Sequence, residues 1–199
     1  DLHSFPTRRS SDLFLDSKKK VPVATAEEFV GRRRLLQKCL RKLRSRGCLG
    51  ILLHGLGGVG KSTVAARLLE RLSGYTPIVI YGRFSVEELM EGLLAEAQNG
   101  RDILNGGLPP VQRLTKFFTQ VRNERNPRFC FVLDNFEANL EARSDGKQVI
   151  QSHAVELLIA LLRSVAQSQR GHRVIITSRY DIDLPAVLND RFDRKPVAA

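Results

Sequence analysis

The sequence predicts an α/β fold in which a parallel β-sheet lies between two layers of helices. Two observations support this prediction. Four short apolar segments, each suited to a buried strand, alternate with longer segments in which apolar residues recur at helical spacing. A glycine-rich loop also joins the first apolar segment to the helical segment that follows it. Strands that alternate with helices pair in parallel, with right-handed connections that place helices on both faces of the sheet.

Length and composition are those of one globular domain. The 199 residues are enough for one well-packed domain and hardly for two, and 42% of them are hydrophobic. No apolar run approaches the length of a membrane span. The three cysteines have no metal-site spacing and cannot all pair, so we expect a cytoplasmic protein.

The first residues need separate treatment. Residues 1–13 (DLHSFPTRRSSDL) resemble the translation of a common sequencing adapter, so we expect an assembly artefact and exclude them from the fold prediction. Residues 14–28 are a polar lead-in, and residues 29–199 hold the predicted domain. We expect the chain to be a fragment of a larger protein.

The elements follow from periodicity and from turn residues. Leucines at helical spacing and Gly47 define the first helix, and glycines and prolines mark residues 99–110 as a loop. The expected elements of this half are a turn and then a helix within 29–47, a strand over 48–54, a helix over 61–72, a strand over 76–82, and helices over 86–98 and 111–124.

The second half adds two strands and one helix. We expect a third strand over 128–134, a polar connection over 135–149, a helix over 153–167 that is apolar almost all round, and a fourth strand over 172–179. The tail that follows has no clear period. Four core strands are therefore predicted and a fifth is not.

The loop after the first strand matches the phosphate-loop pattern G-x-x-x-x-G-K-[ST]. Glycines let successive N–H groups point at a phosphate, with a helix N-terminus behind them. Lys61 supplies a positive charge for the outer phosphates, and the Ser62 hydroxyl can bind Mg²⁺. The sequence thus predicts a nucleotide site with Mg²⁺, formed by Gly55, Leu56, Gly57, Gly58, Val59, Gly60, Lys61, Ser62 and Thr63.

Asp134 ends the third strand, where its carboxylate can reach the Mg²⁺ of a bound triphosphate. Fast hydrolases usually have an acidic residue next, but this chain has Asn135, whose amide can orient a water molecule and cannot deprotonate it. Glu137 is the nearby replacement base. A water-activating role and that of a solvated loop carboxylate both remain open for Glu137.

Arg179 follows the fourth strand, after Thr177 and Ser178. Ligands of open α/β sheets bind at the carboxyl ends of the strands, so we expect Arg179 to sense the γ-phosphate. The alternative is a plain surface charge.

Four segments in this order, FVGR, GLGGVGKST, FVLDNFE and TSR, resemble the STAND class of P-loop ATPases, relatives of the AAA+, NB-ARC and NACHT modules. The resemblance runs from about Phe29 to Pro185. It implies the strand order 5-1-4-3-2 and places Val30 and Arg32 near the adenine. It also implies a catalytic set of Lys61, Asp134, Glu137 and Arg179, with Ser62 and Asp134 as ligands of Mg²⁺.

The resemblance implies an ATP/ADP switch with slow hydrolysis, which forms the core of a multidomain regulator. It further implies that the regulator self-associates in its ATP state and binds protein partners through a region beyond this chain. The fifth strand and the helical lid of such proteins are not found, so we expect an exposed sheet edge beside residues 48–54. The main alternative is a nucleic-acid-acting AAA+ ATPase. A small-molecule kinase and a non-hydrolysing scaffold also remain open.

Positive charge is concentrated near the start of the domain. Residues 18–46 hold eleven Lys or Arg residues and two Glu residues, which is +9 of the chain's net charge of +11. A solvated helix face, a nucleic-acid surface and an anionic membrane surface all suit such a segment. Because no aromatic residue interleaves the basic ones to stack on bases, we favour the solvated face.

Overall fold

The computed structural model describes residues 31–120, 127–168 and 170–198. Three sequence predictions lie outside these residues: the adapter-like segment 1–13, the lead-in 14–28, and the position of Val30. Within the described part, none of the helices is long and apolar enough to cross a membrane.

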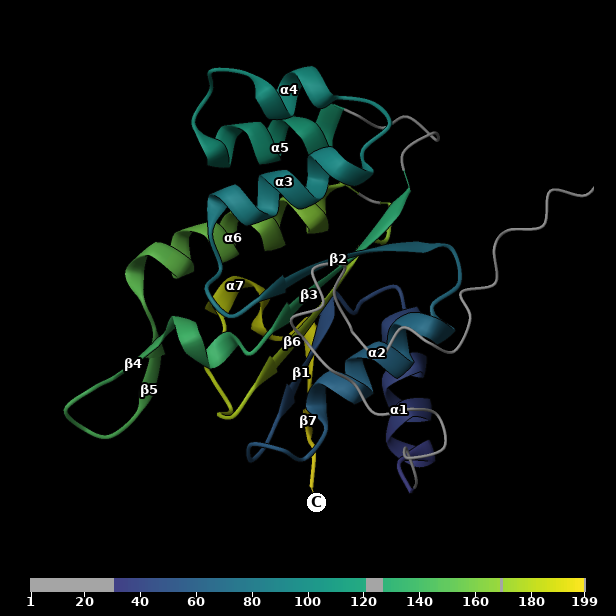
Figure 1. Ribbon diagram of the computed structural model, residues 1–199, viewed down its shortest axis with the longest axis vertical. Helices are drawn as coiled ribbons and strands as arrows, with labels where there is room; N and C mark the ends of the chain where they lie inside the picture. The colour runs from purple at the N-terminus through teal and green to yellow at the C-terminus, as the bar shows by residue number, and fades with distance from the viewer. Residues whose placement is uncertain (1–30, 121–126, 169, 199) are drawn as a thin grey trace, which may run out of the picture.

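A five-stranded parallel sheet forms the centre of the molecule (Figure 1). Its strands are β1 (Gly50–His54), β2 (Tyr75–Tyr81), β3 (Arg128–Asp134), β6 (Arg173–Ser178) and β7 (Phe192–Pro196). They lie in the order β2-β3-β6-β1-β7, which places β6 between β1 and β3. This is the predicted order 5-1-4-3-2, and it confirms the α/β fold class.

The prediction of only four strands, with an exposed edge beside residues 48–54, is wrong. β7 pairs in parallel with β1 along its whole length, from Gly50 opposite Phe192 to His54 opposite Pro196. The strand escaped prediction because charged residues fill three of its five positions and its last residue is proline. Charged residues and proline are tolerated at the edge of a sheet, where only one side of the strand needs partners.

Helices cover both faces of the sheet (Figure 1). α1 (Arg33–Arg44) and α2 (Lys61–Arg71) pack on one face, and α3 (Val86–Glu96), α5 (Pro110–Gln120) and α6 (Ser152–Gln167) cover the other. Each face of the sheet has its own hydrophobic core. Successive residues of a strand contribute to the two cores in turn, because side chains along a strand point to opposite faces. In β1, Leu52 lies in the core under α3 and α6, whereas Ile51 and Leu53 lie in the core under α1 and α2.

Short elements occupy segments that were predicted to be irregular. The loop 99–110 contains α4 (Arg101–Asn105), which buries Leu104. The connection 135–149 contains a 3₁₀ turn, η1 (Phe136–Asn139), and an antiparallel hairpin of β4 (Leu140–Ala142) and β5 (Gln148–Ile150). The tail contains α7 (Ala186–Asn189) before β7. Elements of three to five residues are too short to show a period in the sequence.

Candidate nucleotide-binding site

The candidate site lies at the carboxyl edge of the sheet, where β1, β6 and β3 end side by side. β6 pairs with both of the other strands, so the residues that follow the three strands converge. The phosphate loop follows β1, Asp134 ends β3, and Arg179 follows β6. Segments that are far apart in the chain thus meet at one place.

The phosphate loop runs from Gly55 to Gly60 between β1 and α2. Gly60 adopts a left-handed conformation (φ 82°) at the start of α2, which a side chain would disfavour. A Cβ atom at Gly55 would lie 2.4 Å from the carbonyl oxygen of Val197, so the loop and the segment after β7 touch through backbone atoms. Leu56 and Gly58 at the tip are exposed, while Val59 and Thr63 turn toward the protein.

Lys61 is the first residue of α2 and is almost fully buried. Its Nζ atom donates hydrogen bonds of 2.8 Å to the carbonyl oxygens of Gly55 and Leu56, which belong to the loop that it closes. Burial lowers the pKa of Lys61, and the nearby carboxylate of Glu137 opposes this shift. The ammonium group is therefore held against the phosphate loop.

Asp134 is buried at the end of β3 and accepts hydrogen bonds from two hydroxyl groups. Ser62 Oγ lies 2.9 and 3.0 Å from its two carboxylate oxygens, and Thr177 Oγ1 lies 2.6 Å from one of them. Burial raises the pKa of Asp134, although both hydrogen bonds lower it. Thr177 in turn accepts a hydrogen bond from the Asn135 N–H group. The carboxylate is thus fixed in orientation by neighbours from α2 and β6.

Glu137 and Arg179 form an ion pair beside the phosphate loop. Arg179 Nε lies 3.1 Å from one Glu137 oxygen, and the Arg179 backbone N–H donates to the other. The guanidinium is also 3.6 Å from where a Cβ atom of Gly57 would lie, so it stands against the loop. The arginine side chain is 60% exposed and the glutamate 16% exposed. The pair is therefore open to a ligand that arrives at the loop.

The donor set at this edge fits Mg²⁺. Mg²⁺ prefers oxygen ligands and is usually bound by one or two carboxylates together with the phosphates of its substrate. Ser62 and Asp134 offer a hydroxyl and a carboxylate side by side. Among the described residues no group of three or more His, Cys, Asp or Glu side chains gathers at one point, as an all-protein cage would require.

Arg32 reaches the phosphate loop from the turn before α1. Its Nη2 atom donates a 2.8 Å hydrogen bond to the Ala198 carbonyl oxygen, and its Nη1 atom lies 3.8 Å from the Cβ position of Gly60. The Nη1 atom is buried and has no hydrogen-bond partner within the described part of the chain. The structure thus brings Arg32 to the predicted site.

Two residues at the site were not assigned roles from the sequence. Thr177 anchors Asp134, and the buried amide of Asn139 accepts from the Phe84 N–H group and donates to the Gly82 carbonyl oxygen. Asn139 therefore ties the ends of β2 and β3 together. The sequence could have indicated Thr177, because it is a polar residue at the end of an otherwise apolar strand. No sequence feature indicated Asn139.

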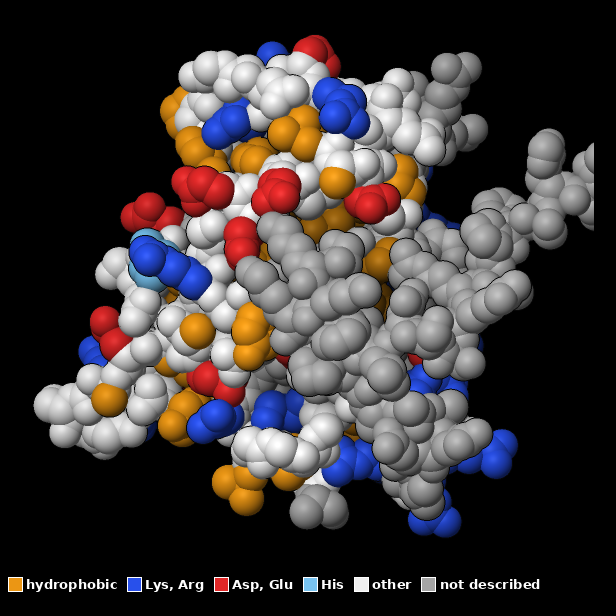
Figure 2. Space-filling model, in the orientation of Figure 1, with side chains coloured by type: hydrophobic (Ala, Val, Ile, Leu, Met, Phe, Trp, Pro, Cys, Tyr) orange, Lys and Arg blue, Asp and Glu red, His pale blue; other side chains and the backbone are white. Residues whose placement is uncertain are grey.

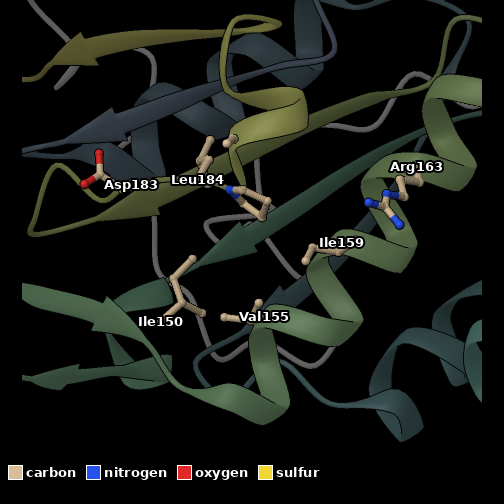
Figure 3. Close-up of a pocket in the computed structure, with 8 residues that line it drawn as sticks. Ile150, Val155, Ile159, Arg163, Asp183 and Leu184 are labelled. Carbon is tan, nitrogen blue, oxygen red and sulfur yellow. The ribbon is translucent and has the colours of Figure 1, made fainter.

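A separate hollow of about 330 Å³ lies between α6 and the segment before α7 (Figure 3). Val155 and Ile159 line it from α6, facing Leu184 and Pro185, with Arg163 and Asp183 as its charged residues. None of the predicted site residues lines it. The hollow is therefore distinct from the phosphate-loop site.

Comparisons with known proteins agree with this fold. A family model described as "AAA ATPase domain" matches residues 28–176. No curated protein sequence matches the chain significantly. Similar solved structures are the Walker-type ATPase of Pyrococcus abyssi (19% identity over 83% of this chain and 49% of that one, TM-score 0.50), a chain of the E. coli MS115-1 HORMA:CdnC:Trip13 complex (11%, 85% and 65%, TM-score 0.50) and C. elegans PCH-2 (17%, 85% and 44%, TM-score 0.48).

The chain spans less than two thirds of the length of each of these structures. For the two with a TM-score of 0.50, the similarity at such identities concerns the fold alone. The match to the family model is evidence of family membership, because it covers well over half of the chain, from just before α1 into β6. On this match, the chain belongs to the AAA ATPase domain family.

Proposed function

We propose that the chain is the nucleotide-binding core of a signalling switch of the STAND class, with ADP in the resting state and ATP in the active one. The observation that carries this proposal is the ion pair between Glu137 and Arg179 beside the phosphate loop. A nucleotide can bias a two-state protein only through contacts that differ between the states. This ion pair is a contact that a γ-phosphate would change and a β-phosphate would not.

Arg179 has two alternative anionic partners in this scheme. In the resting state of this scheme it pairs with Glu137, the contact that the structure contains. With ATP bound, the guanidinium turns to the γ-phosphate, because a phosphate offers more negative charge and more acceptor oxygens than a carboxylate does. The segment after β6, which carries Arg179, then shifts relative to the segment after β3, which carries Glu137.

Release from Arg179 leaves the Glu137 carboxylate free to accept a proton from a water molecule. Lys61 holds the outer phosphates, and Ser62 and Asp134 would hold Mg²⁺, which supplies positive charge to the triphosphate. Hydrolysis is slow in this scheme, because the base is engaged at rest and Asn135 stands where fast hydrolases have an acid. A slow reaction suits a switch, which must persist in its ATP state, and we propose that this state self-associates.

The first test is the identity of the nucleotide that stays bound through purification, released by denaturation and resolved by chromatography. We expect stoichiometric ADP that exchanges slowly. An empty, rapidly exchanging site with turnover that DNA stimulates would contradict the switch and favour a nucleic-acid-acting ATPase.

The second test replaces the sensing arginine. Arg179→Gln should weaken binding of a non-hydrolysable ATP analogue by about 10- to 100-fold, the value of a hydrogen bond to a charged group, and leave ADP affinity nearly unchanged. Arg101→Gln on α4 is the control, since it removes one exposed positive charge away from the loop. Equal losses for ATP and ADP would mean that Arg179 does not distinguish them.

A further inference from the structure

The solvent-facing side of α1 is strongly and uniformly cationic. Its exposed residues, in helical order around that side, are Arg33, Arg44, Gln37, Arg41, Arg34, Lys38 and Lys42, and the helix has no acidic residue. We call these seven residues the cationic face. In Figure 2, Lys and Arg side chains protrude at the lower right, where Figure 1 places α1, whereas several acidic side chains lie higher up, over α3.

The cationic face lacks the carboxylate partners that would explain it as an ordinary solvated surface. Within the described part of the chain, no salt bridge joins any of its six cations to an acid. On the helix that packs against α1, Glu70 already pairs with Arg67 and Arg71. On β7, Asp193 pairs with Lys195. Like charges at i, i+3 and i, i+4, such as Arg34 with Lys38 and Lys38 with Arg41, destabilise a helix unless an anion lies between them.

The packing of α1 argues against a membrane as the anion. An interfacial helix binds a bilayer by burying its apolar side among the lipids. Leu36, Cys39, Leu40 and Leu43 form the apolar side of α1, and all four are buried in the core that α1 shares with α2 and the sheet. The helix therefore has only charge to offer to an outside partner.

The same features favour a double-stranded nucleic acid. Single strands are bound by stacking bases on aromatic side chains. The exposed aromatic residues of the described chain are Tyr81, which ends β2, and Tyr180, which follows β6, and neither lies on α1. Duplex DNA carries one negative charge for about every 1.7 Å of its axis. The twelve residues of α1 span about 18 Å, so six cations face a comparable density of phosphates.

We propose that the cationic face of α1 binds the phosphate backbone of double-stranded DNA without reading its sequence. RNA duplexes are a poorer fit, because their recognition spans about 16 base pairs and two successive minor grooves. This is a longer contact than the roughly 18 Å of α1 offers. A symmetric contact with the same face of a second copy is also a poorer fit, because the two faces carry charge of the same sign. This site is separate from the phosphate loop and does not require the switch.

The test is the salt dependence of binding to a labelled 30-base-pair DNA duplex, measured by fluorescence anisotropy on the full chain. Six phosphate contacts predict that affinity falls about 10³-fold between 50 and 200 mM salt. The triple variant Arg34→Gln, Lys38→Gln, Arg41→Gln should bind more weakly, and its affinity should fall only about 40-fold over the same range. All three side chains are exposed, so the fold should be retained, which circular dichroism checks.

The matched control is Arg101→Gln, Lys116→Gln, Arg143→Gln, which removes the same charge from exposed positions on α4, α5 and the β4–β5 hairpin. We expect it to keep the salt dependence of the unmodified chain. Equal weakening by both triple variants, tighter binding to an RNA duplex of equal length, or binding to phosphatidylserine vesicles but not to DNA would overturn the proposal. Lys61→Ala should leave DNA affinity unchanged, which separates this site from the nucleotide site.

Discussion

The buried carboxylate of Asp134 accepts hydrogen bonds from the hydroxyl groups of Ser62 and Thr177. A strand-end aspartate was predicted, but its two hydroxyl partners come from α2 and β6, and their convergence depends on the strand order. Because burial raises its pKa, Asp134 takes up a proton at a higher pH than an exposed aspartate does. Its fixed orientation, rather than its acidity, is what makes it a suitable metal ligand.

Glu137 is the residue whose role a single substitution can decide. Glu137→Gln keeps the size of the side chain and removes its ability to accept a proton, so ATP turnover should fall on the order of 10²-fold or more. Nucleotide binding should remain, because Lys61 and Ser62 are unchanged. Steady-state phosphate release and equilibrium binding measure the two effects. Unchanged turnover would show that Glu137 serves only as a partner of Arg179.

The buried side chain of His172 should make the free energy of unfolding depend on pH. It is buried, stacked on Phe129, and accepts the Phe129 N–H at Nδ1, and burial with nearby arginines lowers its pKa to about 3. The unfolded chain binds a proton near pH 6.5, so the free energy of unfolding should fall as the pH drops from about 6.5 toward 3, by up to about 1.4 kcal/mol per pH unit.

Urea denaturation at several pH values measures this slope. His172→Asn, whose amide oxygen can still accept the Phe129 N–H, should flatten it between pH 6.5 and 4, whereas the exposed His153→Asn should not. If the curve of His172→Asn ran parallel to that of the unmodified chain, another group would be responsible for the loss of stability.

At the scale of elements, the strands with continuous apolar runs and the long amphipathic helices were predicted within a few residues. Most of the short elements were missed because they are too short to show a period, and β7 was missed because it depends on a partner far away in the chain. β7 is a strand because β1 offers it an edge, not because its own residues favour one. The β4–β5 hairpin was the exception, because Asp145 and Gly146 form a turn pair that could have revealed it.

Gly50 in β1 lies so close to both neighbouring strands that a larger side chain there should destabilise the fold. A Cβ atom at Gly50 would lie 2.1 Å from the Val174 carbonyl oxygen and 2.6 Å from the Phe192 ring, so both neighbouring strands would have to move. Gly50→Ala should lower the free energy of unfolding by about 3 kcal/mol. Gly47→Ala is the matched control, because nothing lies within 4 Å of its Cβ position, and its effect should stay within about 0.5 kcal/mol. Equal effects in urea titrations would contradict the close pairing of β1 with β6 and β7.

At the scale of the whole molecule, the three cysteines report on global unfolding. Cys39, Cys48 and Cys130 are buried, and burial raises the pKa of each thiol, to about 11 for Cys39 and about 12 for Cys130. Thiolates are the reactive form, so all three should resist thiol reagents at pH 8 in the folded protein. In a urea series, their reactivity should appear together with the loss of helical circular dichroism. A thiol that reacts earlier would reveal a locally open region.

The position of β1 between β6 and β7 has a consequence for synthesis on the ribosome. β1 is made early, but its two neighbours in the sheet begin at Arg173 and Phe192, more than a hundred residues later. At about 5 to 20 residues per second, the strand that carries the phosphate loop waits several seconds or more for its first neighbour. The loop therefore reaches its final shape among the last parts of the domain. A nascent chain should become able to bind nucleotide only after β7 has left the exit tunnel.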